Sequence, residues 1–157
     1  MTIRVGMGFD SHRFDPDPQR PLMIGGIRVE GNGLAGHSDG DVLAHAVADA
    51  LLGAAGLGDL GTLFPATDAS LSGADSMELL ARVVTLVTHE GYRVANVDCV
   101  VAAEQPRLGP DRPRMEERLS LTVGAPVGVK PKRTEGLGAL GRGEGIAAWA
   151  VALLERS

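Results

Sequence analysis

The most unusual feature of this sequence is its glycine content, because the glycines recur in short phrases that separate the apolar segments of the chain. The 157 residues include 22 glycines, many of them in the phrases GMGFD, IGGIRVEGNG, GLGDLG and GLGALGRGEG. Glycine adopts positive φ without strain, so most of these phrases predict turns, and some allow close backbone approach to a ligand. The length and the absence of a linker predict a single domain over residues 1–157.

The apolar patterns between the glycines predict an alternation of strands and helices. Strands are expected at four places: 2–9, 21–31 (a pair bent at Gly25-Gly26), 92–104 and 125–133. Helices are expected at 38–55, at 74–91, in the second part of 106–124, and at 144–157, whereas 59–73 is expected to be a loop. This order predicts an α+β fold in which helices cover one face of a mixed β-sheet.

The composition limits the partners and the location of the chain. Hydrophobic residues make up 44% but aromatic residues only 3%, so the core consists of small side chains and the protomer would gain stability from self-association. The net charge of −5, without a basic stripe, argues against nucleic acid as a partner. Cys99 is the only cysteine, and no signal peptide or membrane span is evident, which predicts a cytoplasmic protein.

The stretch AGHSDGDVLAH, residues 35–45, concentrates titratable side chains at the expected start of a helix. Ser38 and Asp41 fit a helix cap, and His37 beside the first helical N–H groups would favour an anion. His45 needs another explanation: at helical spacing it shares one face with Asp41 and Asp49, which would suit a metal ligand with acidic neighbours. A structural histidine is the alternative from this helix alone.

A second cluster favours the metal. Asp10 and His12 lie at the end of the first strand and point the same way, about 6.6 Å apart along an extended chain. With His45 they would form a three-ligand set of one carboxylate and two imidazoles, which zinc accepts while keeping a fourth position open. Manganese and iron accept such ligands too.

The segment KPKRTEGLGALGRGEG, residues 130–145, is a basic patch in an acidic protein. It is either a solvated edge or a phosphate site, and Glu135 within it would suit Mg²⁺ beside phosphates. It matches neither a P-loop nor a dinucleotide fingerprint. Cys99 lies in an apolar strand and is expected to be part of the core.

Taken together, the phrases GFDSHRF, IGG, HSDGDVLAHAVADALLGAAGLGDLGTLFP, GADS, NVD and TEGLGALGRGEGIA resemble the 2-C-methyl-D-erythritol 2,4-cyclodiphosphate synthase family from about residue 3 to residue 155. The resemblance implies conversion of 4-diphosphocytidyl-2-C-methyl-D-erythritol 2-phosphate to the 2,4-cyclodiphosphate and CMP, in non-mevalonate isoprenoid precursor synthesis. It also implies a homotrimer with active sites between subunits.

The resemblance assigns roles to individual residues. It implies zinc at Asp10, His12 and His45, a second cation (Mg²⁺ or Mn²⁺) at Glu135, and transition-state stabilisation by His37 and Arg133. It implies substrate contacts at a larger set: Asp10, His12, His37, Ser38, Asp59, Leu60, Gly61, Phe64, Asp68, Ala103, Arg107, Leu108, Lys132, Arg133, Thr134, Glu135 and Arg142.

The sequence departs from the family pattern at four positions. Lys132 and Arg133 replace two hydroxyl residues that usually meet the nucleotide phosphates, and their long cationic side chains are expected to reach phosphates instead. Ala66 replaces an aspartate, and Ala139 replaces a phenylalanine near the threefold axis.

Two other functions compete with the synthase. The first is a zinc phosphohydrolase on the same triad, although the extra ligands of two-metal phosphatases are missing. The second is a non-catalytic trimer that binds prenyl phosphates, against which the intact metal triad argues.

Overall fold

The central strand of the molecule is the last one in the sequence. The computed structural model describes residues 1–156, and its main sheet has the order β1-β6-β4-β5. Strand β6 pairs antiparallel with both neighbours, whereas β4 and β5 run parallel, so the sheet is mixed as predicted. The strands are β1 (Thr2–Arg13), β4 (Arg93–Ala102), β5 (Val127–Lys132) and β6 (Gly145–Arg156).

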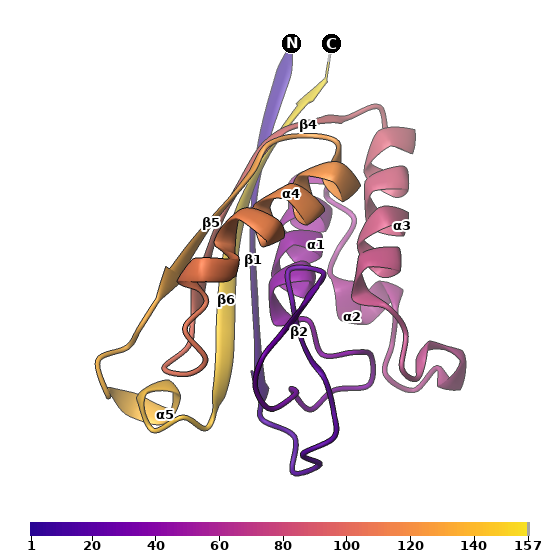
Figure 1. Cartoon of the computed structure of the whole chain (residues 1–157). Helices are drawn as coiled ribbons and strands as arrows, with labels where there is room; N and C mark the ends of the chain where they lie inside the picture. The colour runs from indigo at the N-terminus through magenta and orange to yellow at the C-terminus, as the bar shows by residue number, and fades with distance from the viewer. Residues whose placement is uncertain (157) are drawn as a thin grey trace.

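The long helices gather on one side of this sheet (Figure 1). Helix α1 packs against β1 and β6, α4 packs against β5, and α3 packs on the two helices. These helices are α1 (Val42–Ala55), α3 (Ser76–His89) and α4 (Arg112–Val123). The α+β class, with helices on one face, is therefore confirmed. No helix within residues 1–156 is both long enough and apolar enough to cross a membrane.

Smaller elements complete the chain. The predicted strand pair is a hairpin whose turn is formed by Gly25 and Gly26, both at positive φ. The segment 59–73, expected to be a loop, contains two short helices. The hairpin strands are β2 (Leu22–Ile24) and β3 (Ile27–Val29), and the short helices are α2 (Leu60–Leu63), η1 (Ala69–Leu71), η2 (Gly109–Asp111) and α5 (Gly138–Gly141).

Strand β1 approaches α1 so closely that only glycine fits between them. A Cβ atom on Gly6 would overlap the carbonyl oxygen of Ala50, and one on Gly8 would overlap that of Ala46. Because the positions of β1 that face the helix here are glycines, the strand packs tightly against an alanine-rich helix. It also brings the residues that follow Gly8 on the same face of β1 against the start of α1.

The helix predicted at 144–157 is wrong, because residues 145–156 form strand β6; Ser157 lies outside the described residues. Alanine favours helices, and the segment is apolar on both sides, so no alternation marks it as a strand. Residues such as Ile146, Ala148 and Leu154 are buried on one face, while Trp149 and Val151 are partly exposed on the other.

The start of α1 is also shifted from the prediction. Its N-cap is Asp41, whose side chain accepts a hydrogen bond from the Ala44 N–H, and the helix begins at Val42 rather than Ser38. The ends of the other helices agree with expectation, since Asp75 caps α3 and Gly124 ends α4. Strand β1 continues to Arg13, four residues beyond the predicted end.

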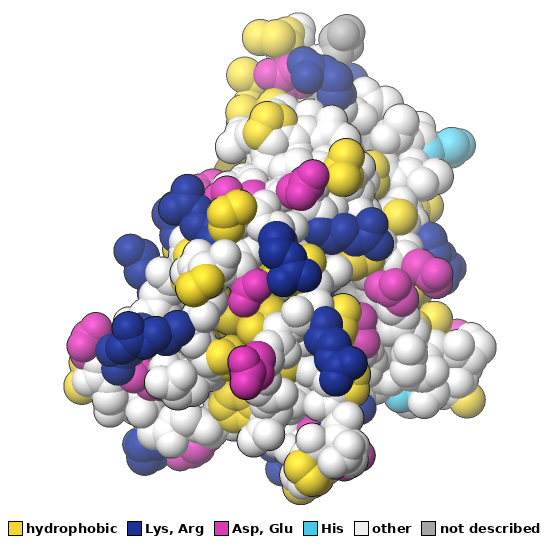
Figure 2. Space-filling model, in the orientation of Figure 1, with side chains coloured by type: hydrophobic (Ala, Val, Ile, Leu, Met, Phe, Trp, Pro, Cys, Tyr) yellow, Lys and Arg dark blue, Asp and Glu magenta, His cyan; other side chains and the backbone are white. Residues whose placement is uncertain are grey.

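The two faces of the molecule differ in character. The helix-covered side carries Lys, Arg, Asp and Glu side chains of mixed sign (Figure 2). The other face of the sheet has no helix over it and exposes six large apolar side chains, at fractions from 38% to 71%: Ile3, Val5, Met7, Phe9, Trp149 and Val151. We call these six residues the bare face. Cys99 is in the core, as predicted, and burial raises the pKa of its thiol to about 12.

Candidate active site

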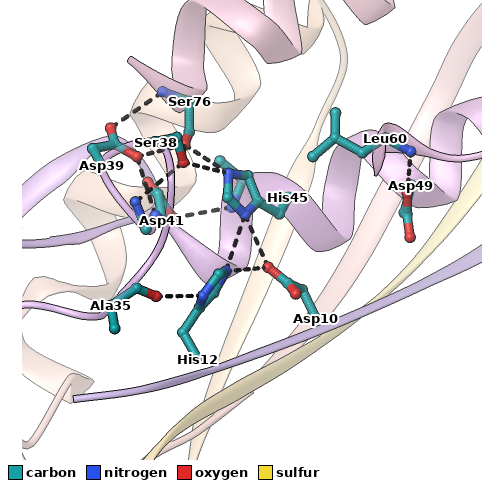
Figure 3. A network of polar contacts seen from close by, with 12 residues as sticks. Asp10, His12, Ala35, Ser38, Asp39, Asp41, His45, Asp49, Leu60 and Ser76 are labelled. Carbon is teal, nitrogen blue, oxygen red and sulfur yellow. Dashed lines mark hydrogen bonds and ion pairs between the residues drawn. The ribbon is translucent and has the colours of Figure 1, made fainter. Parts of the chain in front are cut away.

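Three side chains converge where β1 passes the first turn of α1. Asp10 and His12 alternate along β1 and face the helix, which carries His45. The Asp10 Oδ2 atom lies 2.8 Å from His12 Nε2 and 2.9 Å from His45 Nδ1, and the two ring nitrogens are 3.3 Å apart (Figure 3). The triad predicted from strand and helix spacing is therefore confirmed as a cluster that could hold a metal ion.

Each imidazole ring also makes a polar contact through its second nitrogen, the one that does not face Asp10. His12 Nδ1 lies 2.7 Å from the Ala35 carbonyl oxygen, and His45 Nε2 lies 2.8 Å from Ser76 Oγ and 3.2 Å from Ser38 Oγ. Such outer contacts orient the opposite nitrogens toward a cation. One carboxylate and two imidazoles match the oxygen and nitrogen ligands of zinc and related transition metals, so the residues fit such an ion.

The electrostatics of the triad also suit a cation. Burial raises the pKa of Asp10, but hydrogen bonds and charge from His12 and His45 outweigh it and hold that pKa well below its usual range. The hydrogen bond that His12 donates to the Asp10 carboxylate raises the pKa of His12. The site therefore stabilises positive charge next to an ionised carboxylate, and a metal ion would bind there by displacing protons.

The triad lies at the wall of a cavity of about 400 Å³, and most of the predicted substrate contacts in the first half of the chain line it. Asp68 contributes indirectly, because its carbonyl oxygen lies 2.9 Å from His37 Nε2. The predicted residues around the cavity are Asp10, His12, His37, Ser38, Asp59, Leu60, Gly61 and Phe64; Ala66, in place of the expected aspartate, also lines it.

The expected anion site at the start of α1 is wrong, because a carboxylate of the chain already occupies it. Asp41 accepts hydrogen bonds from the backbone N–H groups of Ala44, Gly25 and Gly26, over 2.6–3.0 Å. Its side chain is fully buried, and this burial raises its pKa. Asp41 thus ties the hairpin to α1, while His37 is exposed at the cavity, five residues before the helix.

Asp49 does not support His45 as expected from their helical spacing. Its Oδ1 atom accepts a hydrogen bond of 2.7 Å from the Leu60 N–H, and Asp59 caps the same short helix through Thr62. Asp49 therefore sets the position of α2 at the edge of the cavity.

The predicted contacts in the second half of the chain form a separate cluster. A cavity of about 360 Å³ is lined by five of them: Ala103, Arg107, Leu108, Lys132 and Arg133. It shares no lining residue with the cavity at the triad. Arg107 and Arg142 line a third, larger cleft of about 900 Å³. The structure therefore does not bring the two halves of the predicted site together within one chain.

Glu104 organises this second cluster and was missed by the sequence analysis. It accepts hydrogen bonds from Arg133 Nη2 (3.0 Å), and from the backbone N–H and hydroxyl of Thr134 (2.7 and 2.9 Å). Glu135, which follows Thr134 in the sequence, is exposed. Among residues 1–156 it is the only non-glycine residue with positive φ (53°). Positive φ in a residue with a side chain is characteristic of functional loops.

Ser76 and Asp39 were also missed as parts of the site. Ser76 contacts His45 on the side away from Asp10, and Asp39 contacts Ser76 in turn; the two residues are 31 and six positions from His45 in the sequence. The phrase GADS, which contains Ser76, was the only sequence signal.

Comparison with known proteins identifies the family. The model of the YgbB family matches residues 3–155. The 2-C-methyl-D-erythritol 2,4-cyclodiphosphate synthase of Thermosynechococcus vestitus is 52% identical over 99% of this chain and 98% of its own length.

Solved structures agree with this relationship. The bifunctional IspDF of Campylobacter jejuni superposes with a TM-score of 0.94 at 41% identity, over 99% of this chain and 43% of that one. IspF of Plasmodium falciparum, in complex with CDP, superposes with a TM-score of 0.85 at 31% identity, over 99% and 97% of the two chains. The chain therefore belongs to the YgbB family, that of the 2-C-methyl-D-erythritol 2,4-cyclodiphosphate synthases.

Proposed function

We propose that this chain performs the family's cyclisation with a zinc ion at Asp10, His12 and His45. The enzyme converts 4-diphosphocytidyl-2-C-methyl-D-erythritol 2-phosphate to 2-C-methyl-D-erythritol 2,4-cyclodiphosphate and CMP, a step in isoprenoid precursor synthesis. The observation that carries the proposal is the convergence of the three ligand atoms at the wall of the cavity. Zinc bound there would supply Lewis-acid stabilisation of phosphate charge.

The reaction needs positioning rather than a protein nucleophile. An oxygen of the 2-phosphate attacks the β-phosphorus, the bond from that phosphorus to the bridging oxygen breaks, and CMP leaves with the bridging oxygen. Two anionic groups must be brought in line, so charge neutralisation and orientation dominate. We assign stabilisation of the transferring phosphoryl group to His37 and Arg133, and phosphate contacts to Ser38, Lys132 and Thr134.

The remaining contacts divide between the two ends of the substrate. We assign the methylerythritol group to the cavity at the triad, where Asp59, Leu60, Gly61 and Phe64 lie, with Asp68 supporting His37. The cytidine group would occupy the second cavity, formed by Ala103, Arg107 and Leu108. The CDP complex of the Plasmodium falciparum relative supports a cytidine nucleotide as part of the substrate. We assign Arg142 to the substrate-binding set on the family resemblance.

We also assign the second divalent cation, Mg²⁺ or Mn²⁺, to Glu135. This carboxylate is exposed beside the basic residues of its loop, and carboxylate oxygens together with phosphates are typical ligands of Mg²⁺.

A homotrimer with sites between subunits would explain two features of the chain. The predicted contacts form two clusters that share no cavity, and the sheet exposes its bare face. A neighbouring copy that covers the bare face could bring the second cluster of one subunit to the triad of another. The single cysteine supports a reducing, cytoplasmic location.

Product analysis tests the proposal. Purified protein with zinc and Mg²⁺ should release CMP and the cyclic diphosphate in equal amounts, and the His45→Ala variant should lose both zinc and activity. His89→Ala is the matched control, since this exposed histidine lies at the far end of α3. A linear product would indicate a phosphohydrolase, and absence of CMP from the zinc-loaded protein would refute the synthase.

A further inference from the structure

A partly buried chain of polar contacts runs away from the triad on the far side of His45. His45 Nε2 lies 2.8 Å from Ser76 Oγ, and Ser76 Oγ in turn donates a short hydrogen bond to Asp39 Oδ1 (Figure 3). The backbone N–H of Ser76 donates to Asp39 Oδ2 over 3.2 Å. Ser76 is only 1% exposed and is the first residue of α3, so this path joins the start of that helix to the metal ligand.

The donors and acceptors along this path fix one arrangement of protons. A carboxylate only accepts hydrogen bonds, so the hydroxyl proton of Ser76 must point to Asp39. The oxygen of Ser76 is then free to accept, so His45 Nε2 must carry a proton. The proton on Nδ1 donates to the Asp10 carboxylate, and a metal ion that displaces it would meet the Nδ1 lone pair between Asp10 and His12.

We propose that Asp39 and Ser76 are positioning residues that hold His45 in the tautomer and orientation required for metal binding. This inference rests on the metal site of the proposed function. Ser38 is a weaker partner, because its Oγ atom is 3.2 Å from His45 Nε2 and also accepts from the Gly40 N–H. Hydrogen-bonded partners of metal-ligating histidines typically change metal affinity by about 10–100-fold when removed.

Zinc affinity, measured by chelator competition, tests the inference without reference to activity. Ser76→Ala should weaken zinc binding by about 10–100-fold, whereas Ser76→Thr keeps the hydroxyl and should restore most of the affinity. Asp39→Asn should weaken binding too, because the hydroxyl and the N–H of Ser76 donate to different oxygens of Asp39, and an amide would replace one of those oxygens by a donor. The Co²⁺-substituted protein should show an altered d–d absorption spectrum in Ser76→Ala and Asp39→Asn.

Ser120→Ala is the matched control, because Ser120 accepts a hydrogen bond from the Val127 N–H far from the triad. It should lose a comparable contact and keep the zinc affinity of the unmodified protein. Zinc affinity within about twofold of the unmodified protein in both Ser76→Ala and Asp39→Asn would overturn the positioning role. Failure of the unmodified protein itself to bind zinc would instead overturn the metal site, so the two failures are distinguishable.

Discussion

At the scale of single residues, Glu104 shows how one carboxylate can hold a loop of opposite charge in place. Hydrogen bonds from Arg133 and Thr134 lower its pKa to about 2, well below that of a free glutamate. Because Glu104 already restricts the guanidinium of Arg133, this side chain would lose less conformational entropy on binding a phosphate. The arrangement gives the Arg133 guanidinium a counter-charge at the start of its own loop.

Glu104→Gln should destabilise the protein in a pH-dependent manner. The pKa of Glu104 in the folded state lies below the usual value of 4.5, so its stabilising effect is complete above pH 4.5 and is lost as the pH falls toward about 2. Urea unfolding should therefore give a lower free energy of unfolding for the variant than for the unmodified protein at neutral pH. This difference in free energy should decrease as the pH is lowered toward about 2. Glu117→Gln, at an exposed position on α4, should show no such trend. A difference independent of pH would contradict this role.

Residue spacing suggests the members of the triad because their placement within each element is local, whereas their meeting depends on the packing of β1 on α1. Asp10 and His12 share a face of any strand, and His45 follows the helix start at a fixed distance. The partners of Ser76 could not be predicted in this way, since α3 reaches His45 only through the packing of α3 on α1. The same holds for Glu104, which meets Thr134 across two neighbouring strands.

At the scale of elements, the contact between β1 and α1 decides where the metal ligands lie. Gly6 and Gly8 let the strand approach the helix, and Asp10 and His12 follow on the same face of β1. The sequence shows these glycines, but not that their role is packing rather than a turn. The assignment of β6 failed for a related reason: the strand is apolar on both faces, so its sequence does not alternate, and because it is rich in alanine it resembles a helix.

Gly8→Ala should destabilise the protein by about 1–3 kcal/mol or more, because the added methyl group overlaps the backbone of α1. It should also weaken zinc binding, since β1 must move away from His45. Gly53→Ala is the matched control: its Cβ atom would lie 3.9 Å from the Met7 carbonyl oxygen, an ordinary contact. Alanine is favoured over glycine within a helix, so this variant should gain roughly 0.5–1 kcal/mol. Thermal and urea unfolding measure both effects, and an unchanged Gly8→Ala variant would contradict the close contact.

At the scale of the whole molecule, the bare face is the largest departure from a self-sufficient domain. Large apolar side chains exposed together usually mark an interface. Phe9 and Trp149 contact each other there, with ring centroids 5.2 Å apart and ring planes tilted by 46°. A chain with few aromatic residues thus places two of them where a neighbouring copy would cover them.

Met7→Asp should convert the assembly to monomers, because a charge would be buried at the centre of the interface. Light scattering should show a trimer for the unmodified protein and a monomer for the variant. The variant should lose synthase activity but keep zinc, since all three ligands come from one chain. Leu121→Asp is the control: Leu121 is 73% exposed on α4, away from the bare face. A monomeric unmodified protein would refute the homotrimer.

Strand β1 carries out two tasks on alternate residues. Its odd-numbered side chains, from Ile3 to Phe9, form part of the bare face, while Asp10 and His12 point to the opposite side. Deletion or insertion of one residue within this strand would exchange the two sets of side chains. The bare face and the metal ligands would then be disrupted together, so the proposed assembly and the metal site depend on the same register of side chains along one strand.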